Sequence, residues 1–181
     1  MRCKQNEQTN KQTINQTIME AKVYVTTVEK NNSWELSGAW LNLNDYECLD
    51  DFLADCRKAH PDEPDPHFVF LDWDENVDSF VSETFIYDGV FDFLKETDEE
   101  DAEMVNAFAK EFGPDRWEEA QERFFAKDDI DLENKVYELL EGTGAFSGMN
   151  ENIVNYFDIT SYTRDLKITD FVEVDGFLFW A

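Results

Sequence analysis

The N-terminal third of the chain alternates hydrophobic and polar positions in the manner of β-strands. Residues 22–29 (KVYVTTVE) are rich in β-branched side chains and predict a strand. After a turn at residues 31–33, residues 34–43 (WELSGAWLNL) predict a second strand, and residues 68–73 (FVFLDW) predict a third. We therefore expect the fold to open with a hairpin, with another strand further along the chain.

A helix is predicted between the second and third strands. Asn44 followed by Glu47 matches a capping box, in which each residue satisfies a backbone N–H at the helix start. Apolar residues then recur at the spacing of one helical face, at Leu49, Phe52, Leu53 and Cys56. The proline-rich segment 60–67 (HPDEPDPH) predicts a rigid loop after this helix.

The middle of the chain changes to a helical pattern. Asp88 is expected to open a short helix that directs Val90, Phe91 and Leu94 inward. Two longer helices follow, one begun by a capping box at Thr97 and Glu100 and ended by Gly113, the other begun by Pro114. Their expected core positions are Met104, Val105, Phe108 and Phe112, then Trp117, Ala120, Phe124 and Phe125.

The last third predicts helices and a closing hairpin. Residues 132–140 predict a helix, and a shorter one is expected near residues 150–156. Residues 167–174 and 177–180 flank Asp175-Gly176, a dipeptide that favours a tight hairpin turn.

These elements predict an α+β fold, in which small β-containing N- and C-terminal domains flank an acidic helical middle domain. The expected boundaries are residues 21–82, 83–125 and 126–181. Residues 1–20 lack the apolar segment of a secretory signal and predict a flexible polar tail. Translation is expected to start at either Met1 or Met19.

The charge of the chain restricts its function. The 181 residues include 42 Asp and Glu against 15 Lys and Arg, a net charge of −27. Such a polyanion repels nucleic acid and anionic membranes, so neither is expected as a partner. No apolar run approaches the roughly 18 residues that a membrane span needs. Solubility of a small domain requires a net charge of only about 2–8, so we interpret the excess as functional.

The negative charge is concentrated in the middle. Residues 62–133 carry 25 acids and 5 bases, whereas the flanks 21–61 and 134–181 have net charges of only −3 and −5. Duplex DNA carries one charge per about 1.7 Å of axis, so the 40 carboxylates after residue 20 correspond to roughly 68 Å of duplex. A symmetric dimer would correspond to at most roughly 40 base pairs. A protein of this kind would compete for the basic groove of a DNA-binding enzyme.

We expect acids of the central block to form the partner-binding surface, with carboxylates in the place of phosphates. The candidates are Asp72, Asp74, Glu75, Asp78, Glu83, Asp88, Asp92, Glu96, Asp98, Glu99, Glu100, Asp101, Glu103, Glu111, Asp115, Glu118, Glu119, Glu122, Asp128 and Asp129.

Cysteine usage indicates a reducing compartment. Cys48 and Cys56 lie eight residues apart on one predicted helix, about 12 Å, which is too far for a disulfide. With Cys3 in the predicted tail, we expect three free thiols in a cytoplasmic protein.

A calcium loop is the main alternative. The spacing of oxygen-bearing residues from Asp72 to Glu83 matches such a loop, but Val77 occupies the position that requires glycine. An acidic calcium-binding or general protein-interaction module is therefore kept as the alternative function.

No pattern of residues argues for an enzyme. His60 and His67 lack a third zinc ligand and are expected to be exposed on their loop. Asp165 and Lys167 match the acid-x-lysine element of nucleases without a well-placed partner acid. A carboxylate-pair hydrolase stays open because a sequence contains no distances. We expect no catalysis, no cofactor and no metal.

Two regions of the chain resemble the ArdA-type antirestriction proteins. Residues 23–43 (VYVTTVEKNNSWELSGAWLNL) are similar to the family's opening strand, turn and E-L-x-G-A-W strand. Residues 137–158 (YELLEGTGAFSGMNENIVNYFD) resemble its antirestriction motif, and residues 161–166 (SYTRDL) resemble its Y-x-R-D-L sequence. The chain departs from the motif at Gly142, where a second acid is expected, and in lacking the usual proline.

The resemblance implies an elongated three-domain protein without cofactor or catalysis, encoded on mobile genetic elements. Such proteins form homodimers through the C-terminal domain, mimic bent B-form DNA and occupy the DNA-binding groove of type I restriction–modification enzymes. The motif residues that it implies for the dimer-forming domain are Leu139, Leu140, Glu141, Gly144, Asn155, Tyr156 and Asp158.

Overall fold

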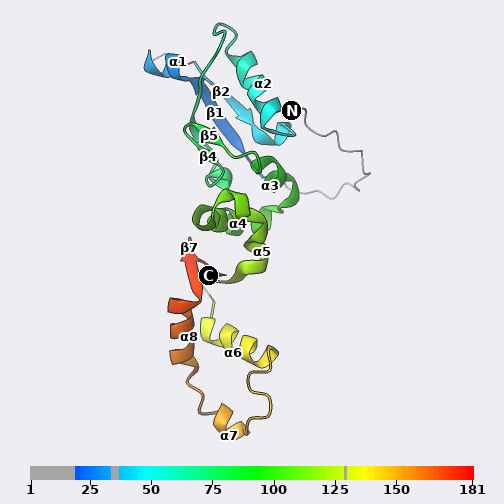
Figure 1. Cartoon of the computed structure of the whole chain (residues 1–181), viewed down its shortest axis with the longest axis vertical. Helices are drawn as coiled ribbons and strands as arrows, with labels where there is room; N and C mark the ends of the chain where they lie inside the picture. The colour runs from blue at the N-terminus through cyan, green and yellow to red at the C-terminus, as the bar shows by residue number, and fades with distance from the viewer. Residues whose placement is uncertain (1–18, 34–36, 129) are drawn as a thin grey trace, which may run out of the picture. The chain divides into compact units, whose positions relative to one another are not determined.

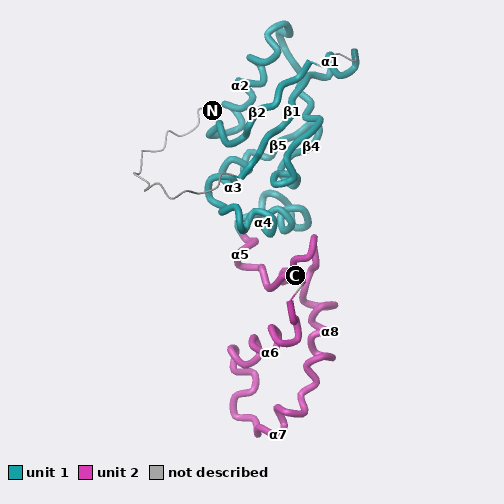
Figure 2. The backbone as a smooth tube through the Cα atoms, turned by 180° about the vertical axis from the view of Figure 1, so that it is seen from behind, with its two compact units in different colours: residues 1–118 teal, residues 119–181 magenta. Residues whose placement is uncertain are grey.

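The computed structural model describes residues 19–33, 37–128 and 130–181, and it divides the chain into two compact units. Unit 1 covers residues 1–118 and unit 2 covers residues 119–181 (Figure 2). Both units combine helices with strands, which confirms the α+β class. The predicted tail lies outside the described residues except for Met19, which is buried, and Glu20. The division into three domains stays a prediction.

A three-stranded antiparallel sheet forms the first part of unit 1. Strand β1 (Lys22–Thr27) lies between β2 (Ala39–Asn42) and β3 (Phe68–Trp73), which confirms the opening hairpin and the third strand. Val23 and Val25 on β1 are completely buried, so one face of the sheet is turned to the core.

The first strand ends two residues earlier than predicted, and the predicted turn after it is wrong. β1 stops at Thr27 because this residue caps helix α1 (Val28–Asn32), and its side-chain oxygen accepts a hydrogen bond from the backbone N–H of Lys30. The expected turn is therefore largely the end of a helix. Residues 34–36 of the predicted second strand lie outside the described residues.

Helix α2 (Leu49–Ala59) begins later than the capping box predicted, with Cys48 as its N-cap. Asn44 belongs instead to a short 3-10 helix, η1 (Leu43–Asp45), and its side-chain amide donates to the carbonyl of Met19 at 2.7 Å. A free backbone N–H at the start of α2, that of Leu49, finds its acceptor far away in the sequence. It donates a hydrogen bond to the Asp88 carboxylate at 3.0 Å. The predicted apolar face is confirmed by the buried Phe52 and Cys56.

The second part of unit 1, from residue 75 to residue 118, is built mainly from short elements (Figure 1). In chain order they are η2 (Glu75–Val77), β4 (Val81–Ser82), β5 (Phe85–Ile86), α3 (Val90–Glu96), α4 (Glu99–Phe112) and the 3-10 helix η3 (Pro114–Glu119). Phe93 stacks on Phe80 with ring centroids 4.6 Å apart and meets the edge of Trp117 at 5.8 Å. α4 starts at Glu99 with Asp98 as N-cap, so the capping box predicted at Thr97 is one residue out of place.

Unit 2 contains a second three-stranded antiparallel sheet and two main helices. Its elements are α5 (Ala120–Arg123), β6 (Phe124–Lys127), α6 (Leu132–Gly142), α7 (Glu151–Val154), α8 (Ile159–Thr169), β7 (Phe171–Val174) and β8 (Phe177–Trp180). The strand order is β6-β8-β7. Asp175 and Gly176 both have positive φ, at 48° and 83°, which confirms the predicted hairpin turn.

Two predictions for unit 2 are wrong. Phe124 and Phe125 lie on strand β6 and not on a helix, because β6 pairs with β8 and Phe124 stands opposite Phe179. Residues 167–169, predicted as strand, complete the helix α8. Pairing with β8, which is distant in the sequence, overrides the local helical pattern at Phe124 and Phe125. The helix that Asp158 caps continues through residues 167–169.

The helices α6 and α8 lie side by side in Figure 1, and the segment that joins them contains α7. Four rings connect the two helices through this segment, with successive centroids 5.3–5.5 Å apart. In order, the rings belong to Tyr137, Phe146, Phe157 and Tyr162. Val136 and Leu140 on α6 are buried.

Two further expectations concern membranes and thiols. Within the described ranges, none of the helices has the length and apolarity needed to cross a membrane. Cys56 is a buried free thiol whose pKa is raised to about 12, mainly by loss of solvent. Cys48 is disulfide-bonded, so the prediction of three free thiols is wrong.

Candidate functional site

Helix α4 is amphipathic, with an apolar buried face and acidic side chains exposed to solvent. Its buried face contains Met104, Val105 and Phe108, while Glu99, Glu100, Glu103 and Glu111 are exposed. The first turn is entirely acidic, a placement that the positive end of the helix dipole stabilises. The amphipathic pattern of the sequence thus places the carboxylates where a partner can reach them.

The density of acids on α4 is close to that of phosphates on DNA. The helix has 14 residues and carries five acids. At 1.5 Å per residue it is about 21 Å long, which gives one acid per about 4 Å. One strand of duplex DNA carries a phosphate per about 3.4 Å of axis.

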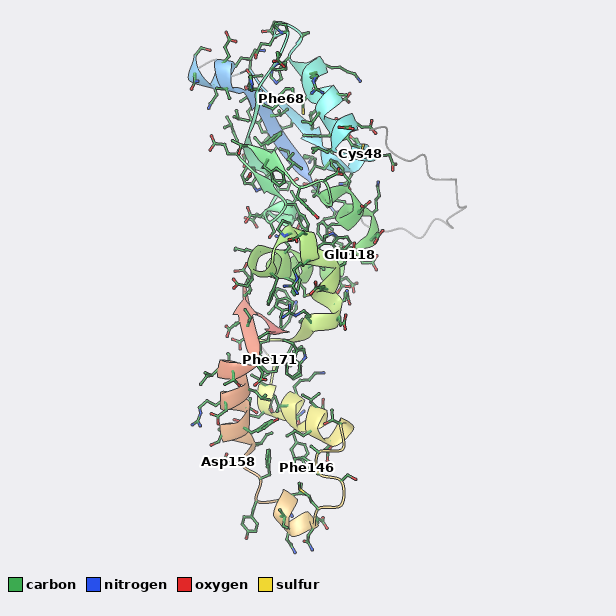
Figure 3. All side chains as sticks on the ribbon, in the orientation of Figure 1. Cys48, Phe68, Glu118, Phe146, Asp158 and Phe171 are labelled. Carbon is green, nitrogen blue, oxygen red and sulfur yellow. The ribbon has the colours of Figure 1, made fainter. Side chains whose placement is uncertain are left out.

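The candidate acids lie mainly on the surface of their units. Of the 19 that the structure describes, 16 are exposed and three are half-buried, namely Asp74, Asp101 and Glu119. Asp129 lies outside the described residues. In Figure 3, Glu118 is labelled close to α4 and α5.

Several candidates have structural partners. The carboxylate of Asp74 accepts from the backbone N–H of Lys22 at 2.7 Å, and Asp88 holds the start of α2. Asp78 accepts from the indole N–H of Trp73 at 3.0 Å. In unit 2, Asp128 pairs with Lys167 at 2.8 Å, and the two acids around Lys167 raise its pKa. These acids stabilise the fold whatever else they contact.

A larger group makes no side-chain hydrogen bond or ion pair within the described residues. We call these eleven residues the unpaired acids: Glu75, Glu83, Asp92, Glu96, Glu99, Glu100, Glu103, Glu111, Asp115, Glu118 and Glu122. All are exposed, and all but Glu122 belong to unit 1. Their carboxylates are therefore available to cations from outside the chain.

The calcium alternative is not supported by the described residues. Val77, at the position that needs glycine, is completely buried in the 3-10 helix η2. Asp74 and Asp78 direct their oxygens to Lys22 and Trp73. Across the described ranges, no group of three His, Cys, Asp or Glu side chains is arranged to hold a metal ion.

His60 was expected to be exposed, and this prediction is wrong. His60 is buried, and its Nδ1 accepts a hydrogen bond from the Lys30 ammonium at 3.1 Å, since lysine can only donate. Lys30 also contacts Asp62 at 2.8 Å and Glu63 at 3.7 Å. The hydrogen bond from Lys30 lowers the pKa of Asp62. This network fastens α1 to the proline-rich loop, while His67 is exposed as predicted.

The motif residues of unit 2 divide into core, cap and surface. Leu140 is buried and Leu139 is half-buried, whereas Glu141, Gly144, Asn155 and Tyr156 are exposed. Tyr156 stands out, with 89% of its surface exposed.

Asp158 has a structural role at the start of α8, where Figure 3 labels it. Its carboxylate accepts from the backbone N–H of Ser161 at 3.0 Å and from the Ser161 hydroxyl at 2.8 Å. These hydrogen bonds lower the pKa of Asp158, the backbone bond most.

A comparison with known families covers nearly all the elements described above. The profile of the family described as Antirestriction protein (ArdA) matches residues 23–178. The chain belongs to the ArdA antirestriction family. The match extends from β1 to the middle of β8 and so includes both units of this ArdA-family chain. No curated protein sequence matches the chain significantly.

One exposed group of this ArdA-family protein was not singled out from the sequence. Trp40 alternates with Ala39 and Leu41 on β2 and is half exposed, next to the ring of Tyr24. The period-2 alternation of the strand predicts that Trp40 lies on the face opposite to Ala39 and Leu41. It does not predict which of the two faces is exposed to solvent.

Proposed function

We propose that this protein inhibits type I restriction–modification enzymes by occupying their DNA-binding groove as a mimic of B-form DNA, without catalysis or cofactor. The observation that carries the proposal is the set of unpaired acids, ten of which lie on unit 1. Membership of an antirestriction family makes a restriction enzyme the expected target. Such an enzyme acts in the cytoplasm, so we expect the protein there.

The physical reason is the exchange of ions at a basic groove. An enzyme that binds DNA holds small anions at its lysines and arginines when the groove is empty, and a polyanion releases them on binding. A carboxylate already in an internal ion pair would contribute little, because the pair as a whole has no net charge. The eleven unpaired acids can all take part.

We also propose that two copies associate through unit 2. Ile153 and Tyr156 are largely exposed there, 63% and 89%, and an exposed apolar patch marks an interaction surface. Association would double the acids presented to one enzyme. A protein with these properties suits a mobile genetic element that enters a restricting host.

Plating unmodified phage on a restricting host that expresses the chain tests the proposal. We expect restriction to be relieved, with the plating efficiency approaching that on a host without the enzyme. Undiminished restriction despite good expression would overturn it. A salt titration of the purified complex is the second measurement, since Kd should rise steeply with salt concentration when many carboxylates are engaged.

A further inference from the structure

Three side chains form a row across the sheet of unit 1, one from each strand. Tyr24 on β1 stands directly opposite Trp40 on β2 and directly opposite Asp72 on β3. Opposed residues of antiparallel strands project to the same face, and neighbouring strands are about 4.8 Å apart. The core side of the sheet is the other face, where Val23 and Val25 are completely buried. Trp40, Tyr24 and Asp72 are hereafter the cross-strand row.

The aromatic part of the row has a defined geometry. The rings of Tyr24 and Trp40 have centroids 5.5 Å apart and are tilted by 58°. Trp40 keeps 51% of its surface exposed. A Cβ atom at Gly38 would come within 2.5 Å of the Tyr24 ring, so this position requires glycine for the ring to lie there. The Gly-Ala-Trp segment at residues 38–40 thus places an aromatic surface towards solvent.

The acidic part of the row has a free oxygen. Asp72 is exposed, and its Oδ1 accepts from the backbone N–H of Trp73 at 3.0 Å. No hydrogen bond to its other oxygen is found within the described residues. Lys22 lies on the same face, two residues before Tyr24, and its ammonium pairs with Glu20 at 3.3 Å. The Lys22 ammonium is therefore already paired with another carboxylate.

We propose that the cross-strand row binds an arginine side chain of the protein's basic partner. A guanidinium is planar and weakly hydrated, so it stacks on an aromatic face and pairs with a carboxylate at the same time. Lysine, a compact and strongly hydrated charge, fits this combination less well. The row adds to the phosphate-like charge a contact that a DNA backbone does not offer.

Charge complementarity identifies the occupant. Residues 19–118 contain 27 acids and 7 bases, a net charge of −20, so this unit attracts a basic surface. A second copy of unit 1 would bring two such charges together. The arginine site rests on the proposed function only in naming the enzyme's DNA-binding groove as the source of the arginine.

The first test uses the full chain and a type I enzyme. Trp40→Leu should weaken binding about 3- to 30-fold, the range of a cation–π contact, without changing the salt slope, because no carboxylate is lost. Trp40→Phe should retain most of the affinity. Phe85→Leu is the matched control, since Phe85 is also exposed but has no aromatic neighbour within the described residues. Thermal unfolding of each variant verifies that it is folded.

The second test is independent of the enzyme. Isothermal titration with octa-arginine and octa-lysine should show a preference for the arginine peptide, and Trp40→Leu should reduce that preference while both peptides still bind. If wild type binds the enzyme but Trp40→Leu equals it in both assays, the arginine site is wrong and the proposed function stands. If wild type fails to inhibit the enzyme yet keeps the arginine preference, the proposed function is wrong and the arginine site stands. Sedimentation in which Trp40→Leu dissociates a dimer would also overturn the site.

Discussion

The two units expose different chemistry to solvent. Residues 19–118 of unit 1 have a net charge of −20, and the described part of this unit exposes few large apolar side chains, which are scattered over separate elements. Unit 2 has 14 acids and 5 bases, a net charge of −9. Six of its large apolar side chains are exposed within residues 149–168: Met149, Ile153, Tyr156, Phe157, Tyr162 and Ile168.

The two surfaces suit two different kinds of partner. A surface of unpaired carboxylates suits a basic partner and repels a copy of itself, whereas an apolar surface suits association between copies. The acids of unit 1 also repel one another, and burial of rings such as Phe93 and Phe108 must outweigh that repulsion. Four predictions test this comparison.

The largest expected effect is on the core of unit 1. Phe108 is completely buried and stacks on Phe112 with centroids 4.5 Å apart. Phe108→Ala should lower the free energy of unfolding by about 3–5 kcal/mol, because it removes apolar contacts and leaves a cavity. Urea denaturation measures this change. The control Phe157→Ala, at a half-exposed ring of unit 2, should cost much less; equal costs would contradict the placement of the core.

The second prediction removes charge from α4 alone. Replacing its four exposed glutamates by glutamine should make enzyme binding less dependent on salt and weaken it about 4- to 1,000-fold, at roughly 0.2–1 kcal/mol for each exposed ion pair lost. The positions are Glu99, Glu100, Glu103 and Glu111. Isothermal titration at several salt concentrations measures both quantities.

The control for α4 changes the same charge elsewhere in unit 1. Four exposed acids outside the candidate set are replaced by their amides: Glu29, Asp45, Asp50 and Asp51. Binding should fall much less, because these residues are not expected at the interface. If both variants lose the same affinity, total charge and not its position determines binding.

The third prediction places a charge in the apolar surface of unit 2. Tyr156→Glu should raise the dissociation constant of the dimer at least about tenfold, because an unpaired charge would be buried on association. Sedimentation velocity over a range of concentrations measures the monomer fraction. Trp40→Glu, at an exposed aromatic of unit 1, should leave the dimer unchanged. A dimer that tolerates Tyr156→Glu would place the contact elsewhere.

The smallest effect is expected at the cap of α8, and it should depend on pH. The folded state lowers the pKa of Asp158. Its contribution is therefore present above the unfolded pKa of about 3.9 and disappears as the pH falls through the lower folded value. Asp158→Ala should lower the melting temperature of unit 2 at pH 7, and the gap to wild type should close on acidification below pH 4. Asp158→Asn, which keeps an acceptor, should lose less.

Features that depend on neighbours along the chain could be predicted from the amino-acid sequence. The amphipathic α4, its end at Gly113 and the Asp175-Gly176 turn follow from interactions between residues at most four apart. Helical periodicity also predicts which acids face solvent, because the apolar positions of the same helix identify its buried side. The family is evident from motifs at the two ends of the chain.

Features that need a partner distant in the sequence became visible only in the folded chain. Strand β6 exists because Phe124 meets Phe179, His60 is buried because Lys30 reaches it, and the start of α2 depends on Asp88. For the same reason the sequence could not separate the unpaired acids from those, such as Asp74, that already have partners. The cross-strand row depends on the register that aligns Trp40, Tyr24 and Asp72. Local periodicity predicts on which face of a helix or strand a residue lies. Only the fold determines which residues from distant parts of the sequence contact it.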